Sequence, residues 1–177
     1  RKRLLPALAQ IEPCTVVLEA CAASHHWARS MRQLGHTARL IAAQHVKPYR
    51  RGQKNDYRDA EAIISAALSP GMHFVGVKSV EQQAEQALHR VRSQLLRQRI
   101  AAANGLRGLL GEYGLAFSKG MRRLRKGAVG FVDSGQAEAL GLTELVWDVL
   151  DELDRLQQRI NSYERQIEQR VRHDPIS

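Results

Sequence analysis

Three carboxylates have the residue type and spacing to bind a metal ion. Asp56 and Asp59 lie three residues apart, and side chains at that spacing share one face of a helix. Glu19 ends an apolar, β-branched run at residues 15–18, which is typical of a buried strand. An unpaired charge at such a place is costly, so Glu19 needs a partner. Hard cations prefer carboxylate oxygens, and the acids therefore predict a site for Mg²⁺ or Mn²⁺.

The same residues also allow a purely structural interpretation. Asn55 is a good N-cap, which would start a helix at Asp56, and acids in a first turn favour the helix dipole. Glu19 could equally form an ion pair with one of the chain's many arginines. Structural ion pairs are commoner than functional sites, so spacing by itself leaves both interpretations open.

A strand–helix–strand unit is predicted to position Glu19. Residues 15–19 form the first strand, in which Val17 and Glu19 share a face because strand side chains alternate. Residues 24–34 follow as a helix, and residues 37–42 as a second strand. Two strands joined by such a helix are expected to run parallel.

Two long helices are predicted in the second half of the chain. Ser79 and Gln82 have the spacing of a capping box, which would open the first helix. The last helix carries apolar residues at alternating steps of three and four, the pattern of a coiled coil. These residues are Val146, Val149, Leu153, Leu156, Ile160, Tyr163 and Ile167. Such a helix can pair with a second copy, which we favour, or fold back on the helix that Ser79 opens.

The chain is strongly basic, with 27 Lys and Arg against 18 Asp and Glu and a net charge of +9. This balance favours a nucleic-acid partner over a merely solvated basic surface. The candidate contacts come from a basic loop at residues 45–53, from the first long helix and from a Gly-rich segment. They are Lys47, Arg50, Arg51, Lys54, Arg90, Arg92, Arg97, Arg99, Arg122, Arg123, Arg125 and Lys126. No acid interrupts the first long helix between Glu85 and Glu112, which favours phosphate contacts.

The predicted strands and helices, together with the local composition, divide the chain into four segments. Residues 1–78 form an α/β domain that ends with a short strand at residues 74–77. Residues 79–112 form a long basic helix, and residues 113–134 a flexible, Gly-rich, basic connector. Residues 135–173 form the coiled-coil helix.

Cysteine usage and hydropathy bear on the location of the protein. Cys14 and Cys21 match no zinc-ligand spacing and are expected to be buried free thiols. No apolar run approaches the length of a membrane span, and nothing resembles a signal peptide. We therefore expect a cytoplasmic protein without a membrane partner.

Several short motifs, taken in order, resemble the DEDD transposases of the insertion-sequence one-ten family, relatives of the Piv DNA invertase. The motifs are Val17-Leu18-Glu19-Ala20-Cys21, His25-His26-Trp27-Ala28-Arg29, Gly35-His36 with Leu40-Ile41, His45-Val46-Lys47-Pro48-Tyr49, and Lys54-Asn55-Asp56 with Asp59-Ala60-Glu61-Ala62-Ile63. Further matches at Phe74-Val75, Lys78-Ser79 and Leu106-Arg107-Gly108-Leu109-Leu110 extend the resemblance over essentially the whole chain. Linked motifs in one order are far more specific than any single motif.

The resemblance implies a RuvC-like catalytic domain with a ribonuclease H-type fold, present here in part. The family is named for four acids, and Glu19, Asp56 and Asp59 match the last three, as ligands of Mg²⁺ or Mn²⁺. The first aspartate is expected upstream of Arg1, and a second domain with a recombination serine beyond Ser177. We therefore expect these residues alone to bind metal weakly or not at all, and to be inactive.

We interpret the sequence as part of a transposase or site-specific recombinase of a bacterial insertion sequence, which cleaves and exchanges DNA strands and associates with the nucleoid. We expect a homo-oligomer held by the coiled coil, and some members of the family also bind a non-coding bridge RNA. The alternatives are a non-catalytic nucleic-acid-binding and oligomerisation module, and a RuvC-like structure-specific nuclease. Such a nuclease would cut synthetic junctions without the ends of the element, whereas a transposase would need them.

Overall fold

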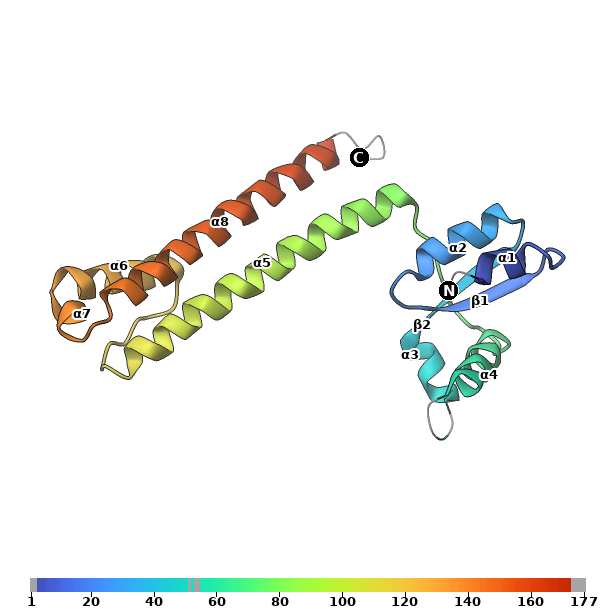
Figure 1. Ribbon diagram of the computed structural model, residues 1–177, viewed down its shortest axis with the longest axis horizontal. Helices are drawn as coiled ribbons and strands as arrows, with labels where there is room; N and C mark the ends of the chain where they lie inside the picture. The colour runs from blue at the N-terminus through green and yellow to red at the C-terminus, as the bar shows by residue number, and fades with distance from the viewer. Residues whose placement is uncertain (1–2, 51, 53–54, 173–177) are drawn as a thin grey trace. The chain divides into compact units, whose positions relative to one another are not determined.

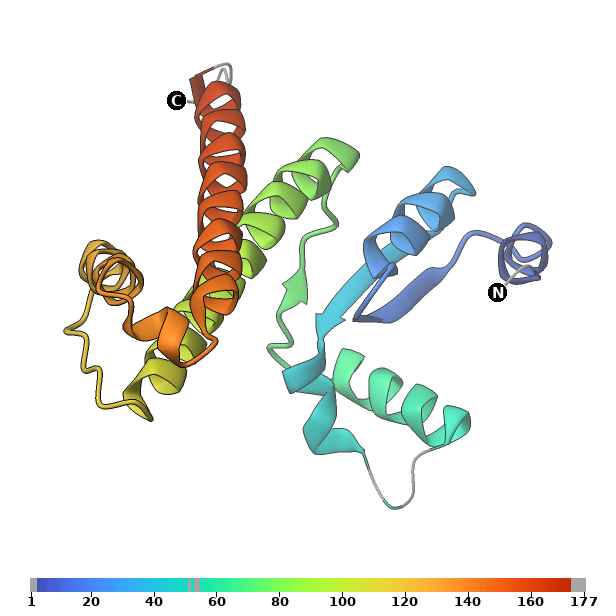
Figure 2. The same cartoon turned by 60° about the vertical axis from the view of Figure 1, so that its left-hand side comes forward.

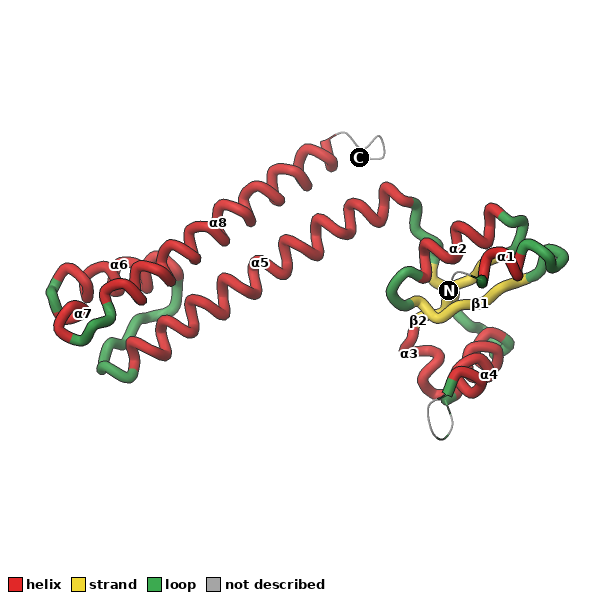
Figure 3. The backbone as a smooth tube through the Cα atoms, in the orientation of Figure 1, coloured by secondary structure: helices red, strands yellow, loops and turns green. Residues whose placement is uncertain are grey.

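The computed structural model describes residues 3–50, 52 and 55–172 and shows a mixed α/β chain (Figure 1). The chain divides into two units, Arg1–Gln83 and Ala84–Ser177, and each is described by itself. Strands occur in the first unit and long helices dominate the second (Figure 3). Within the described residues, no helix combines the length and the apolar character that a membrane crossing requires.

The described part of the first unit contains a small sheet with strand order β1-β2-β3. Strands β1 and β2 run parallel, with Glu19 opposite Ile41, whereas β3 is antiparallel to β2. The predicted strand–helix–strand unit is therefore confirmed. The elements are α1 Leu4–Leu8, β1 Thr15–Ala20, α2 Ser24–Gln33, β2 Thr37–Ala42, α3 Ala43–Val46, the 3-10 helix η1 Lys47–Tyr49, α4 Asp56–Ala67 and β3 Phe74–Val75.

The two faces of the sheet carry separate apolar clusters. Val16 and Leu18 of β1 pack with the side chains of α1 and α2 on one face. Val17 packs with residues of α3 and α4 on the other, where Ile41 of β2 is fully buried. Because strand side chains alternate, Glu19 is on the same face as Val17, as predicted. The α3–α4 face of the sheet therefore carries the carboxylate.

The helix caps read from the sequence are present. Asn55 caps α4, since its Oδ1 accepts a hydrogen bond from the backbone N–H of Arg58 at 2.9 Å. Ser79 and Gln82 form the predicted capping box: the Gln82 N–H donates to Ser79 Oγ at 3.1 Å, and the Ser79 N–H donates to Gln82 Oε1 at 3.0 Å. These caps fix the first residues of α4 and of α5.

The prediction that both cysteines are buried is wrong. Cys14 and Cys21 are free thiols, but both are exposed. Cys14 precedes β1 and Cys21 follows it, so neither lies where the helices cover the sheet. The buried polar residue next to Cys14 is His36, whose Nδ1 accepts from the Cys14 N–H at 3.2 Å.

The second unit is built on two long antiparallel helices (Figures 1 and 2). They are α5 Val80–Gly111 and α8 Thr143–Arg172, with the shorter helices α6 Met121–Asp133 and α7 Gln136–Ala139 between them in the chain. Leu106 and Leu110 of α5 share one core cluster with Val146 and Leu150 of α8. Farther along, Leu95 of α5 packs with Leu156 and Ile160 of α8.

The apolar stripe of α8 is covered within the same chain. Leu156 and Ile160 pack with Leu95 of α5, and Val146 and Leu153 are buried in the cluster that α8 shares with α5, α6 and α7. The pattern therefore identified a packed helix face correctly, and the structure shows the alternative in which this helix folds back on the helix that Ser79 opens. Pairing with a second copy through this helix stays a prediction.

The predicted flexible connector at residues 113–134 is largely a helix. Leu124, Ala128 and Phe131 lie four and three residues apart, and all three are buried against α5 and α8. Phe117, in the loop before α6, packs against this cluster beside Gly127. A Cβ atom at Gly127 would lie 2.1 Å from Phe117 Cε1, so this glycine permits the close approach of the ring.

We expect Gly127→Ala to destabilise the second unit. The added methyl group must displace Phe117, and overpacking of this kind typically costs about 1–3 kcal/mol. Gly130→Ala is the matched control, because it lies in the same helix and its Cβ would meet nothing within 4 Å. That control should be neutral or stabilising by about 0.5–1 kcal/mol, from helix propensity alone. Urea unfolding measures the stability of both variants. If Gly127→Ala gains as much stability as Gly130→Ala, the packing account is contradicted.

Candidate functional site

Glu19 and Asp59 meet at one cation, the guanidinium of Arg50. Arg50 Nη2 lies 2.5 Å from Glu19 Oε2, and Arg50 Nε lies 3.6 Å from Asp59 Oδ1. The three residues come from β1, from the connection after η1 and from the first turn of α4. The fold thus brings together two carboxylates that are forty residues apart in the sequence.

The two carboxylates are partly shielded from solvent. The Glu19 side chain is 19% exposed and the Asp59 side chain is 28% exposed, compared with 40% for Arg50. The strand and the helix carry the acids, and the arginine is the most exposed of the three. Partial burial weakens solvent screening, so each carboxylate gains from a nearby cation.

Asp56, the third predicted ligand, lies one helical turn before Asp59 and is exposed. Within the described residues, Arg50 makes no ion pair with Asp56. Nor do three or more His, Cys, Asp or Glu side chains of the described part converge closely enough to hold a metal ion. The structure therefore brings two of the three predicted ligands together and leaves the third at the edge.

The residues present fit a hard divalent cation. Glu19 and Asp59 offer carboxylate oxygens on rigid elements, and they already converge on a positive charge. The Arg50 guanidinium lies against both carboxylates, and Asp56 is one turn before Asp59 on the same helix. This donor set suits Mg²⁺ or Mn²⁺ better than a thiolate-seeking metal.

The basic loop contributes two described candidates for nucleic-acid contact. Lys47 is exposed in η1, while Arg50 is engaged with the two carboxylates. Arg51 and Lys54 lie outside the described residues. The alternative that Glu19 pairs with an arginine is therefore confirmed, although no local pattern identified Arg50 as that arginine.

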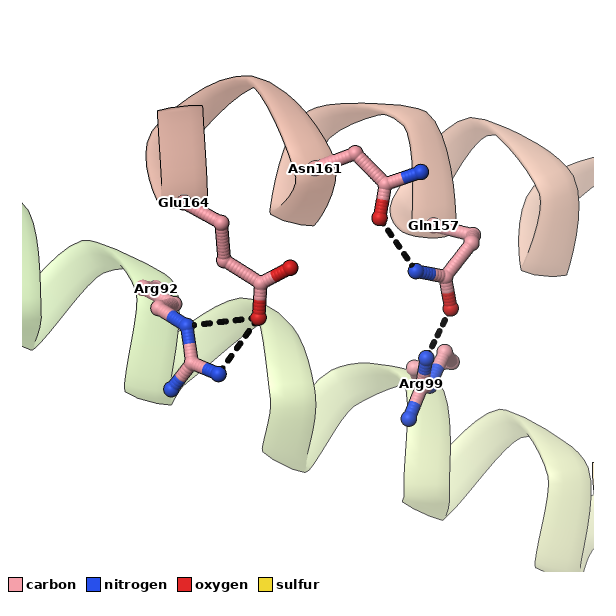
Figure 4. A network of polar contacts seen from close by, with 5 residues as sticks. All are labelled: Arg92, Arg99, Gln157, Asn161 and Glu164. Carbon is pink, nitrogen blue, oxygen red and sulfur yellow. Dashed lines mark hydrogen bonds and ion pairs between the residues drawn. The ribbon is translucent and has the colours of Figure 1, made fainter. Parts of the chain in front are cut away.

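The arginines of α5 fall into two groups. Arg90 and Arg97 are exposed. Arg92 and Arg99 instead turn toward α8 (Figure 4). Arg92 Nε donates to Glu164 Oε1 at 2.9 Å, and Arg99 donates to the side-chain oxygen of Gln157. Two of the four candidates on this helix therefore hold the hairpin together.

The cations of α6 divide in the same way. Arg122, Arg123 and Lys126 are exposed. Arg125 pairs with Asp154 of α8, and this hydrogen bond raises the pKa of Arg125 above its usual value. The exposed members form a basic face that begins at the N-terminus of the helix, where the helix dipole also favours an anion.

The comparisons with known proteins identify the family. A family model described as a transposase, DEDD_Tnp_IS110, matches residues 2–115. This chain belongs to the IS110 family of DEDD transposases. The membership confirms the resemblance read from the sequence motifs, and it places the acids and the basic loop inside the matched region.

Curated relatives support the same assignment. A probable family 20 transposase of Pseudomonas aeruginosa is 49% identical over 167 residues, covering 93% of this chain and 49% of the relative. The transposase for insertion sequence element IS1111A of Coxiella burnetii is 39% identical over 171 residues, covering 94% and 46%. That for element IS1328 of Yersinia enterocolitica is 43% identical over 126 residues, covering 71% and 38%.

The chain thus spans half or less of the length of these curated relatives. No solved structure matches it.

Substitutions of the exposed and of the paired arginines of α5 should affect different properties, DNA binding and folding stability. Arg90→Gln and Arg97→Gln should weaken DNA binding and lower the slope of log K against log salt by about one each, as expected for lost phosphate contacts. Arg92→Gln should leave that slope unchanged and cost roughly 0.2–1 kcal/mol of stability, the usual range for a half-exposed ion pair. Fluorescence anisotropy at several salt concentrations, with urea unfolding, separates the two. Equal effects of all three variants on the salt slope would contradict this division.

Proposed function

We propose that this chain carries metal-binding carboxylates of a DNA transposase that cleaves and exchanges strands with the help of Mg²⁺ or Mn²⁺. The observation that carries the proposal is the convergence of Glu19 and Asp59 on one cation, in a member of a transposase family. Asp56 would complete the set from the preceding turn of α4. We also propose that the sheet with its flanking helices is part of a RuvC-like domain.

Each side chain has a distinct part in this proposal. Glu19, held by β1, and Asp59, held by α4, would bind and orient the cation, and the exposed Asp56 would supply a further carboxylate. The exposed Lys47 binds the DNA backbone close to the acids. A bound Mg²⁺ would polarise a phosphoryl oxygen and stabilise the attacking and leaving oxygens. The acids alone would repel the phosphate, so a cation must neutralise them before DNA approaches closely.

The nucleic acid bound by the second unit is part of the same proposal. Arg92, Arg99 and Arg125 are held by pairs with α8. Within the described residues, the exposed Arg90, Arg97, Arg122 and Lys126 make no such pair, and the exposed Arg123 donates only a long hydrogen bond, at 3.5 Å, to Ser118 Oγ. We assign these exposed cations to the backbone of DNA. A bridge RNA offers the same phosphate chemistry, and competition between labelled DNA and unlabelled RNA distinguishes the two ligands.

The carboxylates can be tested in the full transposase that contains this chain. Glu19→Gln, Asp56→Asn and Asp59→Asn should each reduce transposition to the background of the assay, because a neutral amide binds a hard cation poorly. DNA binding without metal should survive. Glu61→Gln is the matched control, since this acid is exposed on the same helix and should leave transposition intact.

Transposition at the normal frequency in all three carboxylate variants would overturn the metal assignment. It would favour the second candidate, a non-catalytic nucleic-acid-binding module, which the exposed cations of α5 and α6 support independently. In that case, DNA binding would depend on Arg90, Arg97 and the cations of α6 and not on the acids.

A further inference from the structure

Arg50 occupies the point where the candidate metal ligands converge. Its Nη2 and Nε atoms face different carboxylates, at 2.5 Å from Glu19 and 3.6 Å from Asp59. The guanidinium thus bridges a strand residue and a helix residue instead of pairing with a single acid. It supplies one positive charge between two negative ones, and so offsets part of their mutual repulsion.

The arginine and the acids differ in how firmly the fold holds them. Glu19 lies within β1, hydrogen-bonded to β2, and Asp59 lies in the first turn of a capped helix. Arg50 follows the short η1 helix in extended backbone, and its side chain is the most exposed of the three. The carboxylates are therefore fixed, whereas a rotation about side-chain bonds is enough to carry the guanidinium away into solvent.

We propose that Arg50 is a cationic placeholder, which holds Glu19 and Asp59 together until a divalent metal displaces it and which then binds the DNA backbone. The inference rests on the proposed metal site and adds a regulatory coupling to it. Mg²⁺ needs carboxylate oxygens at about 2.0–2.1 Å, and those of Glu19 and Asp59 now face the guanidinium. Two cations cannot share these oxygens without strong repulsion, so metal and arginine compete.

Displacement by the metal would free the Arg50 guanidinium to bind a phosphate. Once a divalent ion has neutralised the acids, the released guanidinium lies beside a site that a phosphate is to enter. Arginine binds phosphate bidentately, and the exposed Lys47 lies three residues earlier. Arg50 would therefore add to DNA affinity only after metal has bound, which couples metal loading to DNA capture.

The first test measures the Mn²⁺ affinity of the full transposase that contains this chain, by electron paramagnetic resonance of the free ion. Arg50→Gln should bind Mn²⁺ about tenfold more tightly than the parent chain, a size typical of coupling between two ligands. Arg50→Lys keeps the charge and should stay close to the parent. Lys47→Gln is the matched control, because it removes a nearby exposed charge from the same loop and should change the affinity much less. Circular dichroism and thermal melting establish that each variant is folded.

The second test measures binding of a fluorescent DNA duplex by anisotropy, in EDTA and in Mn²⁺. In EDTA, Arg50→Gln should bind DNA like the parent, since the arginine is engaged with the acids. In Mn²⁺, the variant should bind several-fold more weakly than the parent. Lys47→Gln should lose affinity equally under both conditions, because its charge is exposed in both.

The outcomes separate this inference from the metal site on which it rests. Equal Mn²⁺ affinity of the parent and Arg50→Gln would overturn the placeholder role and leave the metal site standing. If Arg50→Gln weakens DNA binding by the same factor in EDTA and in Mn²⁺, the coupling between metal and DNA binding is overturned. Absence of Mn²⁺ binding by both proteins would overturn the inference and the metal site together.

Discussion

Alternation along β1 directs the Glu19 carboxylate to the face of the sheet that α3 and α4 cover. Val17 anchors that register by packing with residues of these helices, and Glu19 follows two residues later on the same face. A slip of one residue would turn Glu19 toward α2 and away from Asp59. The acidic site thus depends first on the register of β1. It depends second on the Asn55 cap, because the cap fixes the start of α4, whose first turn carries Asp59.

Charge has two different uses in this chain. Some cations stabilise the fold, as Arg92 does with Glu164 and Arg125 with Asp154. Others, such as Arg90 and Lys126, remain exposed and available to phosphates. Arg50 neutralises two acids, and in our proposal it would move from the first group to the second when a metal ion replaces it. Net charge alone therefore overstates the cationic surface that a nucleic acid can contact.

Local patterns predicted the elements well and their partners less well. The Asn55 cap, the Ser79 capping box and the alternation at Val17 and Glu19 depend on neighbouring residues, so the sequence reveals them. Glu19, one of the two partners of Arg50, lies thirty-one residues away, which no spacing rule reaches. The glycines and cations of α6 concealed a helix that Leu124, Ala128 and Phe131 stabilise by burial. The stripe on α8 likewise did not specify that α5 covers it.

The most direct measurement is anomalous diffraction from crystals of the full transposase that contains this chain, soaked in Mn²⁺. The account predicts an anomalous peak between the carboxylates of Glu19 and Asp59, with the Arg50 side chain moved out of contact with both. A peak elsewhere, or an Arg50 guanidinium still between the two acids in crystals that hold Mn²⁺ at other positions, would contradict it.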